Sequence, residues 1–218
     1  MHHPIWDLPT RLFHWLLAIT FGASWLTHEL GEIELHFYAG YTLLGLLIFR
    51  FLWGFVGSQH SRFSDFIPSL TQLLNYLRTG MSPTPGHNPL GALSVIALLT
   101  LLLAQVLTGL FNADDEGSEG PYHNLLAADW VDRIGEWHAL LFDGLLVLVG
   151  LHLLAIAYYQ LVKKQGLTQA MLSGYKPQQN AKSPPVSHKR ALLVLAISIA
   201  AVVVVVYLAP EVKTSRYF

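Results

Sequence analysis

The stretch HALLFDGLLVLVGLH, residues 138–152, decides the fold, because it is an apolar run bounded by two histidines. It begins a longer apolar segment, residues 138–162, and about 20 apolar residues in a helix span the hydrocarbon core of a bilayer. An ionisable side chain inside such a segment is costly, so each histidine is a candidate functional residue. The segment therefore predicts a membrane-spanning helix that carries two histidines.

The composition of the whole chain agrees with a membrane protein. Of its 218 residues, 53% are hydrophobic and 12% are charged, whereas a soluble domain has about 25% charged residues. The chain has no cysteine, which excludes disulfides, thiolate zinc sites, iron–sulfur clusters and covalently attached c-type haem. The net charge of −1 gives no basis for charge-driven binding of nucleic acid.

Four more apolar segments are long enough to cross a bilayer, which makes five in all. They lie at residues 12–30, 37–55, 90–111 and 191–208. We expect an all-α membrane protein with a four-helix transmembrane bundle in residues 1–175. A cytoplasmic linker follows at 176–189, and residues 190–218 form an additional transmembrane helix with a short outer tail. Between the third and fourth spans, residues 112–135 mix apolar and acidic residues and predict a short helix on the membrane surface.

Basic residues are distributed unequally between the two sides of the predicted spans. With the N-terminus inside, ten of the 13 lie in inner segments: Arg11, Arg50, Arg62, Arg78, Lys163, Lys164, Lys176, Lys182, Lys189 and Arg190. Most acidic residues lie outside, including Asp114, Asp115, Glu116, Glu119, Asp129, Asp132 and Glu136. The positive-inside rule predicts a multi-pass protein of the bacterial inner (cytoplasmic) membrane, with a cytoplasmic N-terminus and a periplasmic C-terminus.

The spacing of His138 and His152 indicates a cofactor. Fourteen residues of helix return to within roughly 40° of the starting direction and rise about 21 Å. The two rings therefore lie on one helix face near opposite leaflets, as axial ligands of two stacked haems would. A second histidine on each iron would leave no open position, which favours electron transfer over oxygen chemistry.

Matching depths across the membrane supplies the second ligands. His36 begins the second span on the outer side and pairs with His138, whereas His14 lies near the inner end of the first span and pairs with His152. His28 is a rival to His36, since it follows His14 by fourteen residues and faces the same way. A purely structural alternative is that each histidine hydrogen-bonds a neighbouring helix. The histidines of the connecting segments are expected to be solvated: His60, His87, His123 and His188.

Several motifs together resemble the bacterial cytochrome b561 and nickel-hydrogenase b-type cytochrome family. They are RLFHW (11–15), HFYAGY (36–41), RFLWGFVG (50–57), RFSDF (62–66), GHNPLG (86–91) and the His138/His152 pair. The resemblance covers roughly residues 5–175 and implies two non-covalent b haems (protohaem IX) with bis-histidine ligation. It implies the same four ligands, His14, His36, His138 and His152, and disfavours His28. The fifth span departs from the four-helix members.

Four further residues are candidates for contacts with the cofactors. Gly40 would let a porphyrin approach the backbone, or serve only helix packing. Arg11 and Arg50 lie near the inner haem's depth and could pair with its propionates, although positive-inside placement also explains them. The resemblance implies quinone near the inner haem, with Asn88 as its contact; the alternative is that Asn88 only caps the helix that begins at Pro89.

These observations predict a membrane di-haem b-type cytochrome that moves electrons between the quinone pool and an outer redox partner such as a periplasmic cytochrome c. The alternative is a membrane anchor and electron-transfer subunit of a hydrogenase- or dehydrogenase-type respiratory complex. Neither function gives the chain an independent catalytic centre, although a quinone oxidoreductase activity is compatible with the first. A non-redox transporter is disfavoured, since the sequence lacks broken helices and paired repeats.

Overall fold

The computed structural model describes residues 5–82, 86–113, 118–175 and 187–210. These residues form eight α-helices and one short 3-10 helix, with no β-strand among them. The elements in order are α1 (Leu8–Glu29), α2 (Ile33–Val56), α3 (Phe63–Phe66), α4 (Leu70–Thr79), α5 (Pro89–Phe111), η1 (His123–Leu125), α6 (Ala128–Leu161), α7 (Leu167–Ser173) and α8 (His188–Tyr207). The expectation of an all-helical fold is confirmed.

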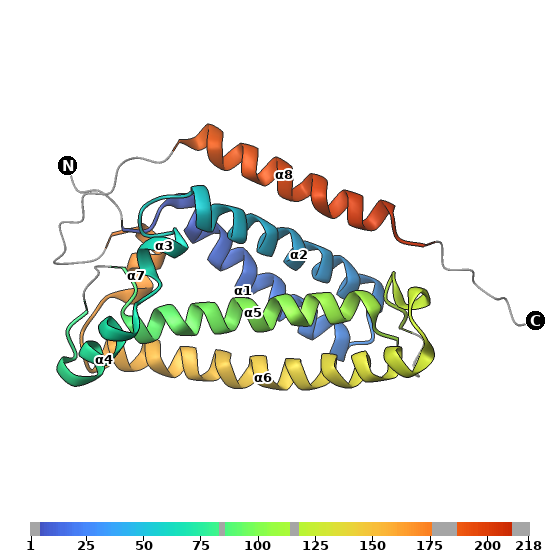
Figure 1. Cartoon of the computed structure of the whole chain (residues 1–218), viewed down its shortest axis with the longest axis horizontal. Helices are drawn as coiled ribbons and strands as arrows, with labels where there is room; N and C mark the ends of the chain where they lie inside the picture. Colours follow the sequence, from blue (N-terminus) through green and yellow to red (C-terminus); the bar gives the residue numbers. More distant parts are fainter. Residues whose placement is uncertain (1–4, 83–85, 114–117, 176–186, 211–218) are drawn as a thin grey trace, which may run out of the picture.

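The five long helices run along the long axis of the molecule, and the short α-helices α3, α4 and α7 gather at one end (Figure 1). Helix α2 is central: it packs on α1, on α5 and on α8, while α5 also packs on α6. Trp53, Leu47 and Leu145 are the largest side chains of the core cluster that are fully buried. Helices α3, α4 and α7 lie at the end where α1 begins and α6 finishes.

Four helices are long and apolar enough to cross a membrane: α2, α5, α6 and α8. Helix α1 was predicted as the first span but is not among them, because polar residues such as His14 and His28 dilute its apolar ones. With 22 residues it is nevertheless about 33 Å long, and it packs along α2. A multi-pass membrane protein is therefore confirmed, whereas the crossing of α1 stays a prediction.

Helix α6 begins ten residues before the predicted span, at Ala128 rather than His138. Its 34 residues extend about 51 Å, well beyond the roughly 30 Å hydrocarbon core. The prediction of a separate surface helix in residues 112–135 is therefore wrong: its last third, residues 128–135, forms the first turns of α6. Among the other described residues of this segment, 123–125 make a 3-10 turn. Hydropathy located the apolar part of the helix but not its polar extension.

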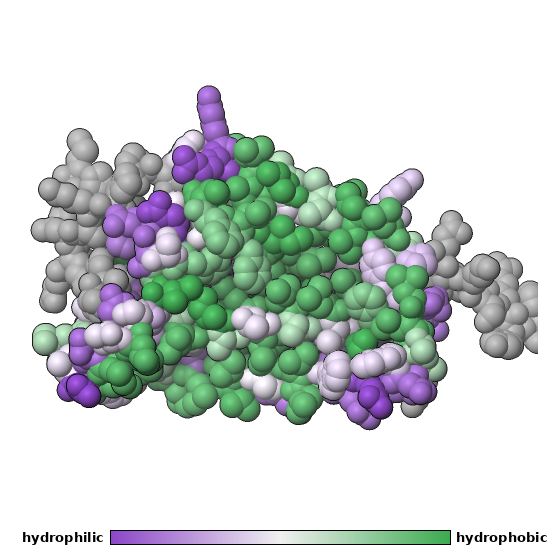
Figure 2. Space-filling view, viewed as in Figure 1, coloured by the Kyte–Doolittle hydropathy of each residue, from purple (hydrophilic) through white to green (hydrophobic). Residues whose placement is uncertain are grey.

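The surface shows a broad apolar middle with hydrophilic residues at the two ends (Figure 2). This pattern is the one expected where lipid surrounds the middle and water the ends. Helix α8 contributes to the apolar middle and is fixed to the bundle at both ends. The Arg190 guanidinium donates to the Val56 carbonyl at 3.0 Å, and the Tyr122 hydroxyl donates to the Val205 carbonyl at 2.5 Å. The greater part of the predicted linker, and the acidic residues Asp114, Asp115 and Glu116, lie outside the described residues.

Candidate functional site

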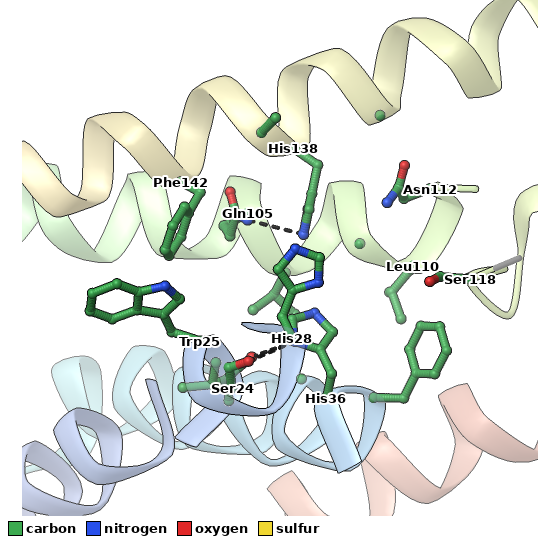
Figure 3. Close-up of a pocket in the computed structure, with 18 of the residues that line it drawn as sticks. Ser24, Trp25, His28, His36, Gln105, Leu110, Asn112, Ser118, His138 and Phe142 are labelled. Atoms are coloured by element: carbon green, nitrogen blue, oxygen red, sulfur yellow. Dashed lines mark hydrogen bonds between the residues drawn. The ribbon is translucent and has the colours of Figure 1, made fainter. Parts of the chain in front are cut away.

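A cavity of about 760 Å³ lies among α1, α2, α5 and α6 (Figure 3). Its size falls within the range of about 300–1,000 Å³ that is usual for small-molecule and cofactor sites. Three histidines from three helices line it: His28 from α1, His36 from α2 and His138 from α6. The structure thus brings together His36 and His138, the pair predicted for the outer haem.

The ring of His36 is oriented by Ser24 of α1. Its Nδ1 lies 2.8 Å from the Ser24 carbonyl oxygen and 3.3 Å from the Ser24 hydroxyl. Because a carbonyl oxygen only accepts, Nδ1 carries the hydrogen and Nε2 carries the free lone pair. Metal-bound histidines characteristically donate their second ring nitrogen in this way, so Nε2 of His36 is available as a ligand.

The ring of His138 is held by α5. Its Nδ1 lies 3.0 Å from the Thr108 hydroxyl, and its Nε2 lies 3.0 Å from the amide nitrogen of Gln105. A Cβ atom on Gly109 would lie only 3.0 Å from Cε1 of His138, so a larger residue there would displace the ring. The ring position therefore depends on three residues within one turn of α5.

His28 shares the cavity with the predicted pair. Its ring centroid lies 5.5 Å from that of His36, and Figure 3 shows both rings beneath His138. Both His28 and His36 are therefore close enough to His138 to be the second ligand of the outer haem. His36 differs in having its Nδ1 bonded to a backbone carbonyl, which favours it as the ligand. Gly40 also lines the cavity, and a Cβ atom built there would meet nothing within 4 Å.

The predicted inner pair also lies together. His14 on α1 and His152 on α6 are near enough to interact electrostatically. Nδ1 of His14 is buried without a hydrogen-bond partner in the described part of the chain. A buried nitrogen in that condition is costly unless something else satisfies it, and His14 thus lacks the Nδ1 hydrogen bond that orients His36 and His138.

The other predicted contacts lie near the end of the bundle where α1 begins and α2 finishes. Arg11 donates to the Leu172 carbonyl. Arg50 is 4% exposed, donates to the Ser61 carbonyl at 3.1 Å and lies 4.9 Å from the centre of the Phe63 ring. The Asn88 side chain accepts from the Gly91 amide at 2.7 Å, the capping role expected as its alternative. Propionate and quinone contacts therefore stay predictions.

His87 was expected to be solvated, and that expectation is wrong. Its ring packs 4.6 Å from the centre of the Trp6 ring and 5.0 Å from that of Phe66. Burial, and then the positive charge of Arg50, lower the pKa of His87 to about 3. The loop position suggested exposure, but the N-terminal segment folds over this residue and removes it from water.

Sequence reasoning missed Ser24, Gln105 and Thr108. Gln105 and Thr108 stand three residues apart in a largely apolar span, and that spacing puts them on one helix face. This signal was available in the sequence. Ser24 acts through its backbone carbonyl on a residue twelve positions away, and nothing local in the sequence marks such a contact.

The fold and cavity define a class of protein: a multi-pass helical membrane protein with paired histidines on facing helices. The chain belongs to the prokaryotic cytochrome b561 family, whose match spans residues 5–174. Among relatives, a probable Ni/Fe-hydrogenase B-type cytochrome subunit of Bradyrhizobium diazoefficiens is 27% identical over 207 residues, covering 78% of this chain and 84% of the relative. A protein of the same name from Rhizobium leguminosarum is 27% identical, with 78% of this chain and 87% of the relative aligned. Another from Azotobacter chroococcum is 24% identical, with 79% of this chain and 87% of the relative aligned. No solved structure matches.

A b-type cytochrome implies haem b, and the cavity residues fit that group. The imidazoles of His36 and His138, on facing helices, would hold its iron, and Gly40 leaves open space in the same cavity. Gln105 Oε1 and Asn112 Oδ1 line the cavity and are buried without partners among the described residues. No three His, Asp or Glu side chains in the described ranges form a site for a bare metal ion.

Proposed function

We propose that this protein is a di-haem b-type cytochrome that carries electrons between the quinone pool and a redox partner on the outer side of the membrane. The outer haem is held by His36 and His138, and the inner haem by His14 and His152. One observation carries the proposal: His36 and His138 line the same cavity, and the Nδ1 of each is already hydrogen-bonded to the protein. Nε2 of each ring is then the nitrogen that would bind iron, and the Gln105 amide, 3.0 Å from Nε2 of His138, would give way to it.

The chain's own residues fix the ligands and exclude water. Haem b, when bound, supplies one-electron oxidation and reduction through its iron. Two histidine ligands leave no axial position open, which suits electron transfer. Ser24 and Thr108 orient the outer imidazoles, and Gly109 lets the His138 ring lie against α5. The apolar residues around the cavity lower the local dielectric and so influence the reduction potential.

The proposed topology follows the chain from the cytoplasm to the periplasm. Residues 1–175 form the haem-binding bundle, 176–189 the cytoplasmic linker, and 190–218 the additional span with its outer tail. The clustering of α3, α4 and α7 at one end supports this arrangement, because that end carries basic residues such as Arg62, Arg78 and Lys163. Quinone is proposed to bind at this inner end, with Asn88 as its contact.

Two kinds of outer partner are compatible with this function. The names of the relatives favour a hydrogenase-type enzyme, to which this chain would be the membrane anchor and electron-transfer subunit. A periplasmic cytochrome c is the other partner, favoured by the outer acidic residues, which include Asp132 and Glu136 at the mouth of the cavity. The first partner would associate permanently and the second transiently.

The haem-to-protein ratio of the purified protein tests the core of the proposal. Reduced-minus-oxidised spectra combined with extracted haem should give two low-spin b haems per chain. One haem per chain, or a high-spin signal, would contradict the four-ligand assignment. To separate the partners, an affinity-tagged chain is purified from membranes in mild detergent. Stoichiometric recovery of large and small hydrogenase subunits supports the subunit role, and purification of the chain alone supports a transient partner.

A further inference from the structure

We propose that Thr108 is a positioning residue that fixes the tautomer of His138 and lowers the reduction potential of the haem that His138 binds. The inference rests on the proposed function, since it concerns one of the four proposed ligands. Thr108 lies on α5 and not on either helix that supplies the outer ligands. Its part would therefore be to act on iron through His138.

The hydroxyl of Thr108 has a defined direction. Its oxygen lies 2.9 Å from the Ala104 carbonyl and 2.9 Å from the Gln105 carbonyl, and it donates to this pair. A hydroxyl has one hydrogen and two lone pairs. Since its hydrogen is used by the α5 backbone, Thr108 can only accept from the His138 Nδ1 that lies 3.0 Å away. Nδ1 of His138 therefore carries a hydrogen.

The opposite side of the ring gives the same result. The amide nitrogen of Gln105 lies 3.0 Å from Nε2 of His138, and an amide nitrogen only donates. Nε2 must accept, so it has a lone pair and no hydrogen. The orientation of the Gln105 amide thus agrees with the tautomer that the Thr108 contact requires, in which Nε2 has the lone pair that would bind iron. In this structure the Gln105 amide occupies that lone pair.

A hydrogen-bond acceptor at Nδ1–H affects the electronic properties of the imidazole ligand as well as its orientation. It raises the basicity of the imidazole, and a more basic ligand stabilises the more positive, oxidised iron. The potential of the outer haem should therefore be lower with Thr108 than without it. Nδ1 of His36 makes the equivalent hydrogen bond to the Ser24 carbonyl at 2.8 Å. The His138 ring also has a hydrogen bond to the backbone of Gln105, which no substitution removes, whereas the Thr108 contact with Nδ1 comes from a side chain and can be removed by substitution.

Three variants test the role of the hydroxyl. Thr108→Val keeps the shape and removes the acceptor, Thr108→Ser restores it, and Thr100→Val removes an exposed hydroxyl on the same helix as a matched control. The midpoint potentials of both haems are measured by spectroelectrochemical titration of the purified protein, together with haem content. Thr108→Val should raise the potential of the outer haem, by about 59 mV if the preference for the oxidised state falls tenfold. Thr108→Ser and Thr100→Val should match the wild type, as should the inner haem throughout.

An unchanged outer potential in Thr108→Val, with both haems bound, would overturn the proposal. An equal shift in Thr100→Val would do the same, because the effect would then be unspecific. If Thr108→Val does not accumulate, Thr108→Ala removes the same oxygen and carries the same expectation. The variant His138→Ala distinguishes this failure from a failure of the proposed function. If His138→Ala keeps both haems, His138 is not a ligand. If His138→Ala loses one haem while Thr108→Val leaves the outer potential unchanged, only the role of Thr108 is refuted.

Discussion

The indole Nε1 of Trp53 donates a 3.1 Å hydrogen bond to the buried carboxylate of Asp7. The same carboxylate accepts from the backbone amide of Thr10 at 2.7 Å and from the Ser61 hydroxyl at 3.1 Å. Asp7 is therefore both the N-cap of α1 and the acceptor that joins the start of α1 to the end of α2 and the loop after it. This contact sets where α1 lies, and with it the position of His14.

The first prediction is that Asp7→Ala destabilises the inner end of the bundle. It leaves the buried indole of Trp53 without its acceptor, at about 1–3 kcal/mol for an unsatisfied buried group, and it removes a helix cap worth about 1 kcal/mol. Thermal unfolding in detergent, followed by tryptophan fluorescence, should show a clearly lower midpoint. Asp65→Ala is the control, because its ion pair with Arg62 is partly exposed and such pairs contribute under about 1 kcal/mol. Equal losses in the two variants would argue against a special role for Asp7.

The second prediction concerns the ligands. His138→Ala should lose the outer haem and His152→Ala the inner haem, each with the other signal retained at least in part, because each iron would lose one of two axial nitrogens. Haem content and low-temperature difference spectra report the loss. His36→Ala and His28→Ala form a matched pair from one cavity. Loss of the outer haem in His28→Ala but not in His36→Ala would exchange the two assignments.

These histidines show which parts of the fold and of the site can be predicted from the sequence. Apolar segments predicted the helices, the fourteen-residue spacing put His138 and His152 on one helix face, and matching of depths across the predicted membrane paired His36 with His138. The polar start of α6 at Ala128 was missed, because hydropathy measures lipid contact and not helix length. The packing of His87 against Trp6 was missed too, since it depends on contacts between segments eighty residues apart. Thr108 was predictable in part: the sequence places it on one helix face with Gln105, but it does not indicate that its partner is His138.

The third prediction is a loss of stability in mild acid that depends on His87. The pKa of its imidazole falls from 6.5 to about 3 in the fold, so its contribution is complete above about pH 6.5. That contribution declines as the pH falls from 6.5 towards 3, because the unfolded chain then binds a proton that the fold excludes. The limiting slope is about 1.4 kcal/mol per pH unit. The groups that disfavour the proton electrostatically are Arg50, His152, His14 and His60.

His87→Gln removes this titration. Unfolding midpoints measured between pH 7.5 and pH 5, about one unit on one side of the ordinary histidine pKa and more than one on the other, should fall less steeply in the variant than in the wild type. Its stability at pH 7.5 can be lower, since packing against Trp6 is altered, so the slope and not the level is the test. Parallel slopes would mean that His87 is accessible to protons.

The fourth prediction is the membrane orientation. The unequal division of basic residues places Lys163, Lys164 and residues 62–87 in the cytoplasm. A reporter enzyme fused after Lys176 should be active only in its cytoplasmic form. A fusion after Leu30, between the first two helices, is the control of opposite sign and should need the periplasm. Activity of a periplasmic reporter at Lys176 would reverse the topology and the inner and outer assignment of the haems.

The last prediction concerns the outer acidic surface. Among the described residues, Glu29, Asp132, Glu136 and Asp143 line the cavity that holds His36 and His138, and Asp129 lies in the first turn of α6. A soluble redox partner that docks here should present a basic face, because complementary charge raises the association rate. The alternative is that these acidic side chains only follow the topology and keep the surface hydrated.

Salt separates these two explanations. The Debye length falls from about 30 Å at 0.01 M salt to about 10 Å at 0.1 M, so a steered encounter slows across that range. Oxidation of the reduced protein by a cytochrome c should therefore slow with salt, and it should be slower and less salt-dependent when Asp129, Asp132 and Glu136 are replaced by amides. A second set, Asp114, Asp115, Glu116 and Glu119, tests the predicted loop. Asp65→Asn, at the opposite end of the molecule, is the control and should leave the rate unchanged. If the oxidation rate changes neither with salt nor with either set of substitutions, this surface is not a docking site for a soluble cytochrome. A permanently bound enzyme subunit would then be the better explanation of the outer partner.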